Sequence, residues 1–233
     1  MIDLSFLSIF SLAITDAINP CALAVMILVL SEILTRHPEN KKKMLHAGLL
    51  FTLAVFLLYF AYGLIMTKFF SSIPATGIFS SYVSKGFGIF SIILGLLNLK
   101  DYMNYRPGGF ATEMPMKFRP RLRMLVKKVE SPLGAFFIGI FVTLFLLPCS
   151  IGPYIIASQQ LASLSFAQIV LWLLYYNLIF ILPMLAITLI IYASIATVDK
   201  VSGWRERNIR KLHLAEGIIL IIIGILMLTG LIY

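Results

Sequence analysis

The sequence predicts an all-α integral membrane protein with six transmembrane helices in a 3+3 inverted-topology repeat. Three observations predict this fold class. The chain is 60% hydrophobic and only 12% charged, which excludes a soluble globular domain. Six apolar runs are long enough to cross a bilayer, which takes about 20 residues. The third and sixth runs also resemble each other at a fixed offset, which indicates an internal duplication.

The six apolar runs have soft boundaries. The first has no Lys or Arg before it and is longer than the apolar part of a signal peptide, so we expect it to remain as a membrane span. The runs lie near Phe6–Ile33, Met44–Phe69, Ile78–Leu99, Pro132–Gln160, Phe166–Ala193 and Leu212–Leu231.

The internal repeat is clearest in the third and sixth runs. Residues 88–99 and 217–228 are identical at seven of twelve positions, at an offset of 129. Because each half holds three spans, an odd number, the second copy enters the membrane from the opposite side. We expect a first three-helix repeat at 1–105, a basic cytoplasmic linker at 106–130 and a second, inverted repeat at 131–233. The glycines of the two runs are expected close-packing positions: Gly86, Gly88, Gly95, Gly217 and Gly224.

The basic residues predict the orientation. Seventeen of the 19 Lys and Arg residues lie in or beside the first, third and fifth connections between runs. The other two are Lys68 and Lys85. Basic loops stay in the cytoplasm, so we expect a multi-pass protein of the plasma membrane with both termini outside. The net charge of +9 then reflects topology and contact with anionic lipid, and no nucleic-acid partner is expected.

Each of the two cysteines directly follows a proline near the middle of a long run. The pairs are Pro20-Cys21 in the first run and Pro148-Cys149 in the fourth, 128 positions apart. Proline removes a helical hydrogen bond, so we expect both helices to be broken there. One such cysteine is often an inert packing residue, but two in matching positions favour a dithiol–disulfide couple. A purely structural disulfide is a weaker alternative, because such bonds usually fasten extracellular loops.

Other residues near these pairs are candidate supporting residues. Gly152 and Pro153 follow the second cysteine and would loosen the fourth helix further. Asp16 is an acid deep inside a span, where acids are functional by default, but it equally fits a cap for the half-helix that follows. Asn19 has the same two interpretations, as a polar hinge residue or as a cap.

The remaining polar residues of the spans carry little chemistry. His37, His46 and His213 fall in a basic loop or near span ends, and we interpret them as interfacial. Glu216 is interpreted in the same way, as a side chain that reaches the interface. No spacing of His or Cys is typical of a metal or haem site, so we expect no metal and no cofactor.

With these motifs the chain resembles the CcdA cytochrome c biogenesis family, which is similar to the membrane domain of DsbD. The resemblance rests on Pro-Cys in the first run, Pro-Cys-x-x-Gly-Pro in the fourth, the six spans and the inverted repeat, and it covers essentially the whole chain. Ala24 departs from the pattern, since many relatives have a second proline at that position.

The resemblance implies a transmembrane electron transporter, a thiol–disulfide oxidoreductase in the broad sense. Cys21 and Cys149 would form a reversible disulfide that cytoplasmic thioredoxin reduces and an extracytoplasmic thioredoxin-like protein oxidises. Such transfer would support cytochrome c maturation. The alternative function is a solute or metal-ion transporter on the same 3+3 scaffold, since broken helices and inverted repeats are typical of transporters and thiols bind soft metals.

Overall fold

The structure is a computed structural model that describes residues 2–18, 20–37, 39–72, 78–105, 124–126, 129, 131–194 and 197–231. Within these ranges, the side chains of 2–5, 20–22, 78–81, 83–84 and 144–151 are not described. The described chain is almost entirely helical and contains no strand, which confirms the all-α fold class.

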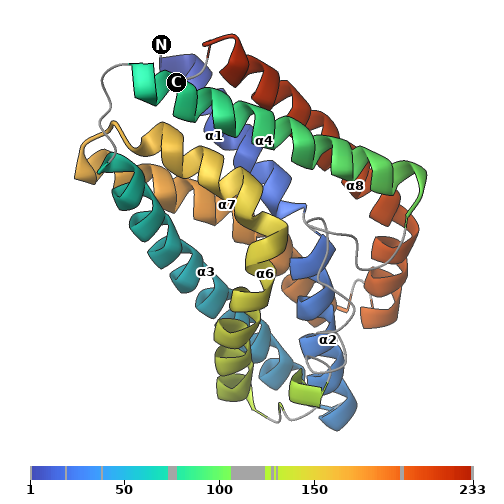
Figure 1. Cartoon of the computed structure of the whole chain (residues 1–233). Coiled ribbons are helices and arrows are strands. Elements are labelled where there is room, and N and C mark those ends of the chain that lie inside the picture. The colour runs from blue at the N-terminus through green and yellow to red at the C-terminus, as the bar shows by residue number, and fades with distance from the viewer. Residues whose placement is uncertain are drawn as a thin grey trace.

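The helices follow one another with short connections where the chain is described. They are α1 (Ile2–Ala17), α2 (Pro20–Arg36), α3 (Lys41–Ser71), α4 (Ile78–Met103), α6 (Pro132–Leu161), α7 (Phe166–Tyr192) and α8 (Val198–Leu228). Helix α3 packs against α6 and α7, and α4 pairs with α8 along another side of the molecule (Figure 1). Helix α1 contacts α6, α7 and α8, so it lies between these two groups.

Side-chain caps fix where several helices begin. The Asn40 side chain accepts a hydrogen bond from the backbone N–H of Lys43 at 3.0 Å, at the start of α3. Ser131 caps α6 in the same way, with Pro132 at the first helical position, where its missing N–H costs nothing. Thr197 is the corresponding cap of α8. Polar caps between apolar runs therefore set the helix boundaries.

The outer surface of the helices is apolar. Four helical segments of the described chain are long and apolar enough to cross a membrane: α3, residues 85–103 of α4, α7 and α8. Two shorter apolar stretches are Phe6–Ala17 and Pro132–Thr143. On α3, Leu49, Leu53 and Leu57 recur every four residues and are 40–48% exposed. Such a leucine stripe facing outward fits lipid and not water, and the chain is a membrane protein.

The first apolar run is broken at the predicted position. Helix α1 ends at Ala17 and α2 begins at Pro20. The backbone N–H of Ile18 still bonds to the Ile14 carbonyl at 3.0 Å, so the α1 hydrogen-bond pattern extends to this residue. A break immediately before a proline is expected, because proline disfavours helical backbone in the residue that precedes it.

The fourth apolar run is not broken, contrary to the prediction. Helix α6 is assigned as one helix from Pro132 to Leu161 and continues through Pro148 and Pro153. Its path bends along its length (Figure 1). A proline in a membrane helix is tolerated as a kink when neighbouring helices pack around the site, and α3 packs along α6. The two Pro-Cys sites therefore have different backbone conformations.

The last helix is longer than its apolar run. The sequence predicts a span from near Leu212, but α8 begins at Val198 and includes the basic segment that was expected to be a connection. Hydropathy marks only the part of a helix that is surrounded by lipid, whereas backbone hydrogen bonding continues into a polar segment. The first half of α8 carries most of the charged residues of this helix.

Four of the five predicted glycines bring α4 and α8 together. A Cβ on Gly95 would lie 2.8 Å from the Gly217 carbonyl oxygen, and one on Gly88 would lie 3.0 Å from the Gly224 oxygen. In the reverse direction, a Cβ on Gly217 would lie 2.9 Å from the Gly95 oxygen, and one on Gly224 would lie 2.6 Å from the Gly88 oxygen. These contacts confirm the close-packing interpretation. Gly86 is the exception, since a Cβ there would meet nothing within 4 Å.

Two polar residues of α8 are buried, although the sequence predicts them at the interface. His213 is fully buried, and its Nδ1 lies 2.8 Å from Asn98 Oδ1 on α4. Glu216 is 3% exposed. The interfacial interpretation of both residues is wrong, because the close approach of α4 and α8 encloses side chains that would face solvent or headgroups on a single helix.

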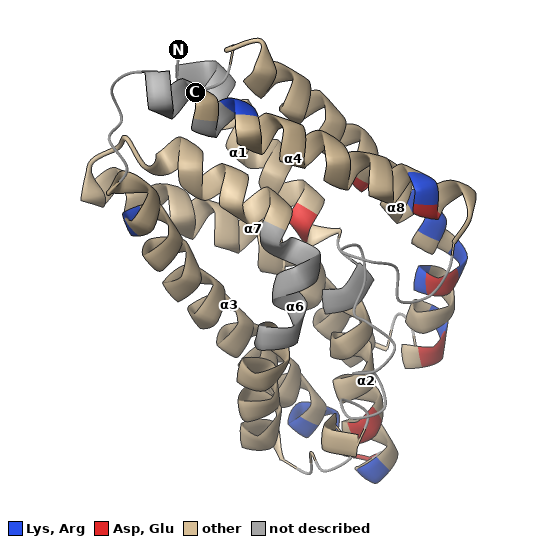
Figure 2. Ribbon diagram, viewed as in Figure 1, with Lys and Arg blue, Asp and Glu red and all other residues tan. Residues whose placement is uncertain are grey.

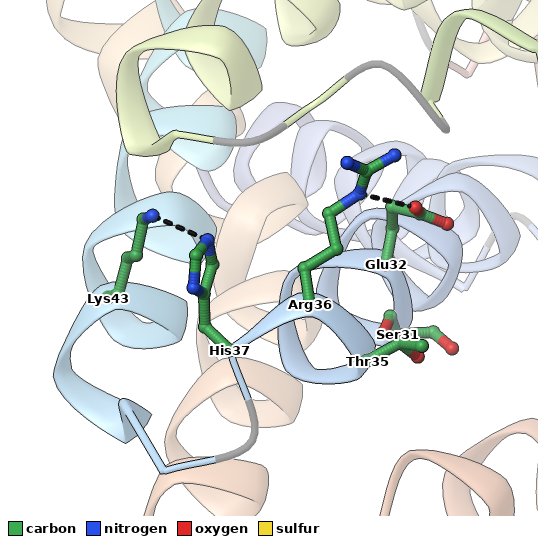
Figure 3. A network of polar contacts seen from close by, with 6 residues as sticks. All are labelled: Ser31, Glu32, Thr35, Arg36, His37 and Lys43. Atoms are coloured by element: carbon green, nitrogen blue, oxygen red, sulfur yellow. Dashed lines mark hydrogen bonds and ion pairs between the residues drawn. The ribbon is translucent and has the colours of Figure 1, made fainter.

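Charged residues gather at one end of α2 and α3 and on the first half of α8 (Figure 2). At the α2–α3 junction, Arg36 Nε donates to Glu32 Oε1 at 2.8 Å, and Lys43 Nζ lies 2.6 Å from His37 Nε2 (Figure 3). These pairs organise the loop that carries the first group of basic residues.

Candidate functional site

Asp16 is the starting point of the candidate site because it is a fully buried acid in an apolar helix. It lies in the last turn of α1, before the break that separates α1 from α2. Tyr176 of α7 donates its hydroxyl hydrogen to Asp16 Oδ2 at 3.1 Å. The same hydroxyl lies 3.4 Å from the carbonyl oxygen of Leu12, a longer and weaker alternative. Asp16 is thus joined to α7 across the interior.

A second set of hydrogen bonds links α7 to α6 and α3. Asn177 Nδ2 donates to the Tyr154 hydroxyl oxygen at 3.3 Å and to the Leu173 carbonyl at 2.8 Å. The Tyr154 hydroxyl in turn donates to the backbone carbonyl of Tyr59. This carbonyl lies inside α3, so Tyr154 connects the last third of α6 with the middle of α3.

Ring contacts join the two sets into one cluster. The Tyr154 and Tyr176 rings meet edge to face with centroids 5.1 Å apart, and Tyr59 and Tyr154 do the same at 5.5 Å. Tyr59 also stacks on Phe180 at 4.4 Å. We call Asp16, Tyr59, Tyr154, Tyr176 and Asn177 the buried polar cluster. All five are at most 4% exposed, and they come from α1, α3, α6 and α7.

The buried polar cluster offers hydrogen bonds in an apolar interior. Its phenol and amide groups are neutral donors and acceptors, and Asp16 adds a carboxyl group. Within the described chain, Asn177 Oδ1 has no hydrogen-bond partner. An unused acceptor next to three tyrosines is able to receive a hydroxyl or amide hydrogen from a polar ligand. The described residues hold no group of three or more His, Cys, Asp or Glu side chains that could hold a metal ion.

The candidate residues predicted from the sequence whose side chains the structure describes lie at two different contacts. Asp16 is in the buried polar cluster, where it accepts a hydrogen bond from Tyr176. Gly152 and Pro153 are buried in α6, and Gly152 packs so closely on Leu94 of α4 that a Cβ there would overlap the leucine side chain. Gly152 therefore allows α6 and α4 to approach, which is a packing role.

The other candidates lie wholly or partly outside the described residues. Asn19 is not described. The backbones of Pro20 and Cys21 belong to the start of α2, and those of Pro148 and Cys149 to α6, but their side chains are not described. A bond or contact between the two thiols is therefore outside the described part of the structure.

Four members of the buried polar cluster were missed by the sequence analysis. Tyr59, Tyr154, Tyr176 and Asn177 all stand in long apolar runs, where they count as part of the hydrophobic composition or as single interruptions. The signal that identifies them is the requirement that a buried tyrosine hydroxyl or amide find a partner. Asn177 in the middle of the fifth run is the clearest case, because polar residues inside membrane spans bond across helices.

The comparison with known proteins covers nearly the whole chain. Residues 9–231 match the family model SfLAP, described as Sap, sulfolipid-1-addressing protein. No curated protein and no solved structure matches the chain.

This match overturns the resemblance to the CcdA family and the function that it implied. Pro-Cys pairs, six apolar runs and an internal repeat are short or compositional features that unrelated membrane families share, whereas the family model matches along the sequence. Electron transfer from cytoplasmic thioredoxin to an outer thioredoxin-like protein, and support of cytochrome c maturation, lose their basis. The alternative of a solute or metal-ion transporter gains no support either. Since the match extends over residues 9–231, the chain belongs to the SfLAP family.

Proposed function

We propose that this membrane protein acts in the addressing of a sulfolipid, that is, in directing a lipid with an acidic sulfur-containing headgroup to its destination. The observation that carries the proposal is the match of residues 9–231 to the sulfolipid-1-addressing family. The apolar outer surface of the helices gives such a lipid direct access to the protein from the bilayer.

The buried polar cluster supports this function because a lipid headgroup needs polar partners inside an apolar protein. We assign contact with a hydroxyl or amide hydrogen of the headgroup to Asn177 Oδ1, the acceptor that has no partner in the described chain, and we propose that Tyr154 holds the Asn177 amide in place. An ionised Asp16 would repel an acidic headgroup, so its proposed role is to hold the Tyr176 hydroxyl through the 3.1 Å hydrogen bond. Each assignment gives one residue a separate, testable task.

The proposed architecture is six spans in two inverted repeats, 1–105 and 131–233, joined by the basic linker 106–130. The contacts between α4 and α8 support it. At the repeat offset of 129, Gly88 corresponds to Gly217 and Gly95 to Gly224, and exchanging the two halves converts the Gly88–Gly224 contact into the Gly95–Gly217 contact. A contact set that maps onto itself in this way is expected of a two-fold arrangement.

We further propose that Pro20 and Pro148 mark corresponding bends of the two halves, loosened in α6 by Pro153. Asn19, Cys21 and Cys149 adjoin these bends, and we propose that they line them without redox chemistry. The proposed location is the plasma membrane with both termini outside, supported by the clustering of basic residues at one end of α2 and α3 and on the first half of α8 (Figure 2).

Lipid labelling in cells tests the function. The gene is deleted from the organism that encodes the chain, sulfolipids are labelled with radioactive sulfate, and surface lipids are extracted separately from membrane lipids. We expect the surface share of labelled sulfolipid to fall while its total synthesis continues, and we expect the wild-type gene to restore it. An unchanged surface share in the deletion strain would overturn the proposal.

A matched pair of variants tests the site. Asn177→Leu removes the amide of the buried polar cluster and should not restore the surface share. Asn208→Leu makes the same change on the basic half of α8, where the Asn208 amide donates to the Trp204 carbonyl within the same helix, and should restore it. Both variants need equal amounts of folded protein in the membrane. If Asn177→Leu fully restored the surface share of sulfolipid, the buried polar cluster would not be required for the function.

A further inference from the structure

A groove between the last turns of α3 and the first turn of α7 has no role in the function described so far. Its volume is about 230 Å³. Four of its lining residues belong to α3 and two to α7: Leu64, Ile65, Lys68, Ser71, Phe166 and Ile169. The α3 residues are spaced so that they share one face of that helix.

The groove changes in polarity along its length. Helix α3 ends at Ser71, so Leu64 and Ile65 lie one turn deeper in the helix than Lys68. The deep part is therefore lined by aliphatic side chains, and the ammonium group and the Ser71 hydroxyl stand near the end of the helix. This order, apolar inside and charged at the end, is the order of chain and headgroup in a membrane lipid.

The charge of Lys68 is not compensated within the described chain. No hydrogen bond or ion pair of its ammonium group occurs there, and no Asp or Glu lines the groove. Lysines near the ends of membrane helices commonly extend to the interface. Here the lysine also forms part of the wall of an apolar groove, so an anion at this position would lie beside a place for an apolar chain.

The walls of the groove are held together. Ser71 Oγ donates to the Ala162 carbonyl at 2.7 Å, which ties the end of α3 to the turn before α7. The backbone N–H and the hydroxyl of Ser165 both point to Gln168 Oε1, at 3.1 and 2.8 Å, and fix the first turn of α7. Phe166 begins this helix, so the positive end of the α7 dipole adds to the field of Lys68.

The volume limits what the groove holds. Pockets that enclose a whole small-molecule ligand usually measure about 300–1,000 Å³. The groove is smaller than this, which fits one headgroup-proximal chain segment with the rest of the lipid remaining in the bilayer. A site of this size would select a lipid by the charge of its headgroup at the end of the groove and by the access of its chain along α3.

We propose that this groove binds the acidic headgroup and the adjoining chain of a sulfolipid. The proposal rests on the function proposed above and specifies where the lipid first contacts the protein. Lys68 pairs with the sulfo group, and Leu64, Ile65 and Ile169 contact the chain. Charge complementarity selects this lipid over its uncharged counterpart.

Lipid binding to the whole protein in nanodiscs tests the groove. Nanodiscs of phosphatidylcholine are supplemented with sulfated galactosylceramide, with uncharged galactosylceramide or with phosphatidylglycerol, and native mass spectrometry measures the bound lipid. We expect the wild type to retain the sulfated lipid and not the uncharged one. Lys68→Gln should weaken retention of the sulfated lipid about fivefold, and Lys68→Arg should preserve it.

The control and a second variant keep the test decisive. Lys85→Gln removes the other isolated basic residue, which does not line the groove, and should leave binding unchanged. Ile65→Trp fills the apolar part and should weaken binding while Lys68 is intact. Helix content and size-exclusion profile must match the wild type for every variant.

Three results would overturn the proposal: equal affinity of wild type and Lys68→Gln for the sulfated lipid, equal loss with Lys85→Gln, or phosphatidylglycerol bound as tightly as the sulfated lipid. The last result would mark the groove as a general anionic-lipid site. If the wild-type protein does not bind the sulfated lipid in nanodiscs but cells still need the protein for surface sulfolipid, the groove alone is refuted. Normal binding with no effect of gene deletion refutes the proposed function alone.

Discussion

Asp16 occupies a position that is unfavourable for a carboxylate on an isolated helix. It lies in the last turn of α1, where the helix dipole opposes a negative charge, and it is fully buried. The Tyr176 hydroxyl offsets part of this cost with one hydrogen bond. A residue kept in such a place despite its cost is typical of function or of specific helix pairing.

A double-mutant cycle measures this pair. Tyr176→Phe removes the hydroxyl and Asp16→Ala removes its acceptor, and we expect a coupling free energy of about 0.6 kcal/mol, with about 1.7 kcal/mol as the upper end for membrane helices. Reversible unfolding in detergent micelles gives the four free energies of unfolding. Tyr175→Phe is the control, because this neighbouring ring packs on Phe6 and Trp172 and makes no described contact with Asp16. Zero coupling for Tyr176 would show that the hydrogen bond does not stabilise the fold.

At the residue scale, the sequence singles out Asp16 but neither the neutral polar groups of the cluster nor the buried Glu216. Asp16 stood out because a carboxyl group is rare inside a span. Asn177 and the tyrosines did not, since their burial becomes informative only when the partner helix is known. His213 was assigned to the interface from its place near a run boundary, and its burial depends on Asn98, which is 115 residues away in the sequence.

At the level of elements, α4 and α8 approach each other closely through their glycines. Carbonyl oxygens of each helix lie where a side chain of the other would start. Ser91 Oγ also donates to the Leu220 carbonyl at 2.7 Å, between the two pairs of glycines. Isoleucine side chains also lie close, with Ile221 Cγ1 2.6 Å from a Cβ on Gly95, but moving them aside would leave the backbone oxygens in the way of an added methyl group.

Alanine substitutions test this contact. Gly95→Ala places a methyl group 2.8 Å from the Gly217 oxygen, so we expect the free energy of unfolding to fall by about 1–3 kcal/mol, the usual cost of overpacking. Gly86→Ala is the matched control on the same helix. It meets nothing within 4 Å and should be neutral or slightly stabilising, because alanine favours helix over glycine. Equal stabilities in a denaturant titration in bicelles would contradict the packing argument.

Helix boundaries were predictable where a local rule decides them. The break before Pro20 follows from the restriction that proline places on the preceding residue. Pro148 is subject to the same restriction, yet α6 continues through it while packing along α3. The early start of α8 at Val198 was hidden from hydropathy, since that segment is helical but polar.

At the scale of the whole molecule, the distribution of basic residues predicts the topology. We expect tags at both termini to be accessible to a protease outside intact cells. A tag inserted in the basic linker 106–130 should become accessible only after permeabilisation, because loops rich in Lys and Arg are retained in the cytoplasm. A cytoplasmic tag at the C-terminus would contradict the six-span, inverted-repeat architecture.

The class of molecule followed from composition, whereas its family did not. An apolar chain with long runs can only be a membrane protein, and the structure agrees. The expected function rested on two Pro-Cys pairs, the Gly-Pro that follows the second pair, the six apolar runs and the repeat. Such a small set cannot separate membrane families that share spans and repeats, and the family match over residues 9–231 required information spread along the whole sequence.

The pairing of α4 with α8 also has a consequence for biogenesis. Helix α4 is synthesised before α6 and α7, and its glycine face has no partner until α8 has entered the membrane. During this interval the nascent protein exposes the glycine face of α4, with its uncovered backbone, to lipid or to other helices. Completion of this contact therefore depends on the insertion of α8, and a chain that stops before α8 would present an open dimerisation surface to membrane quality control.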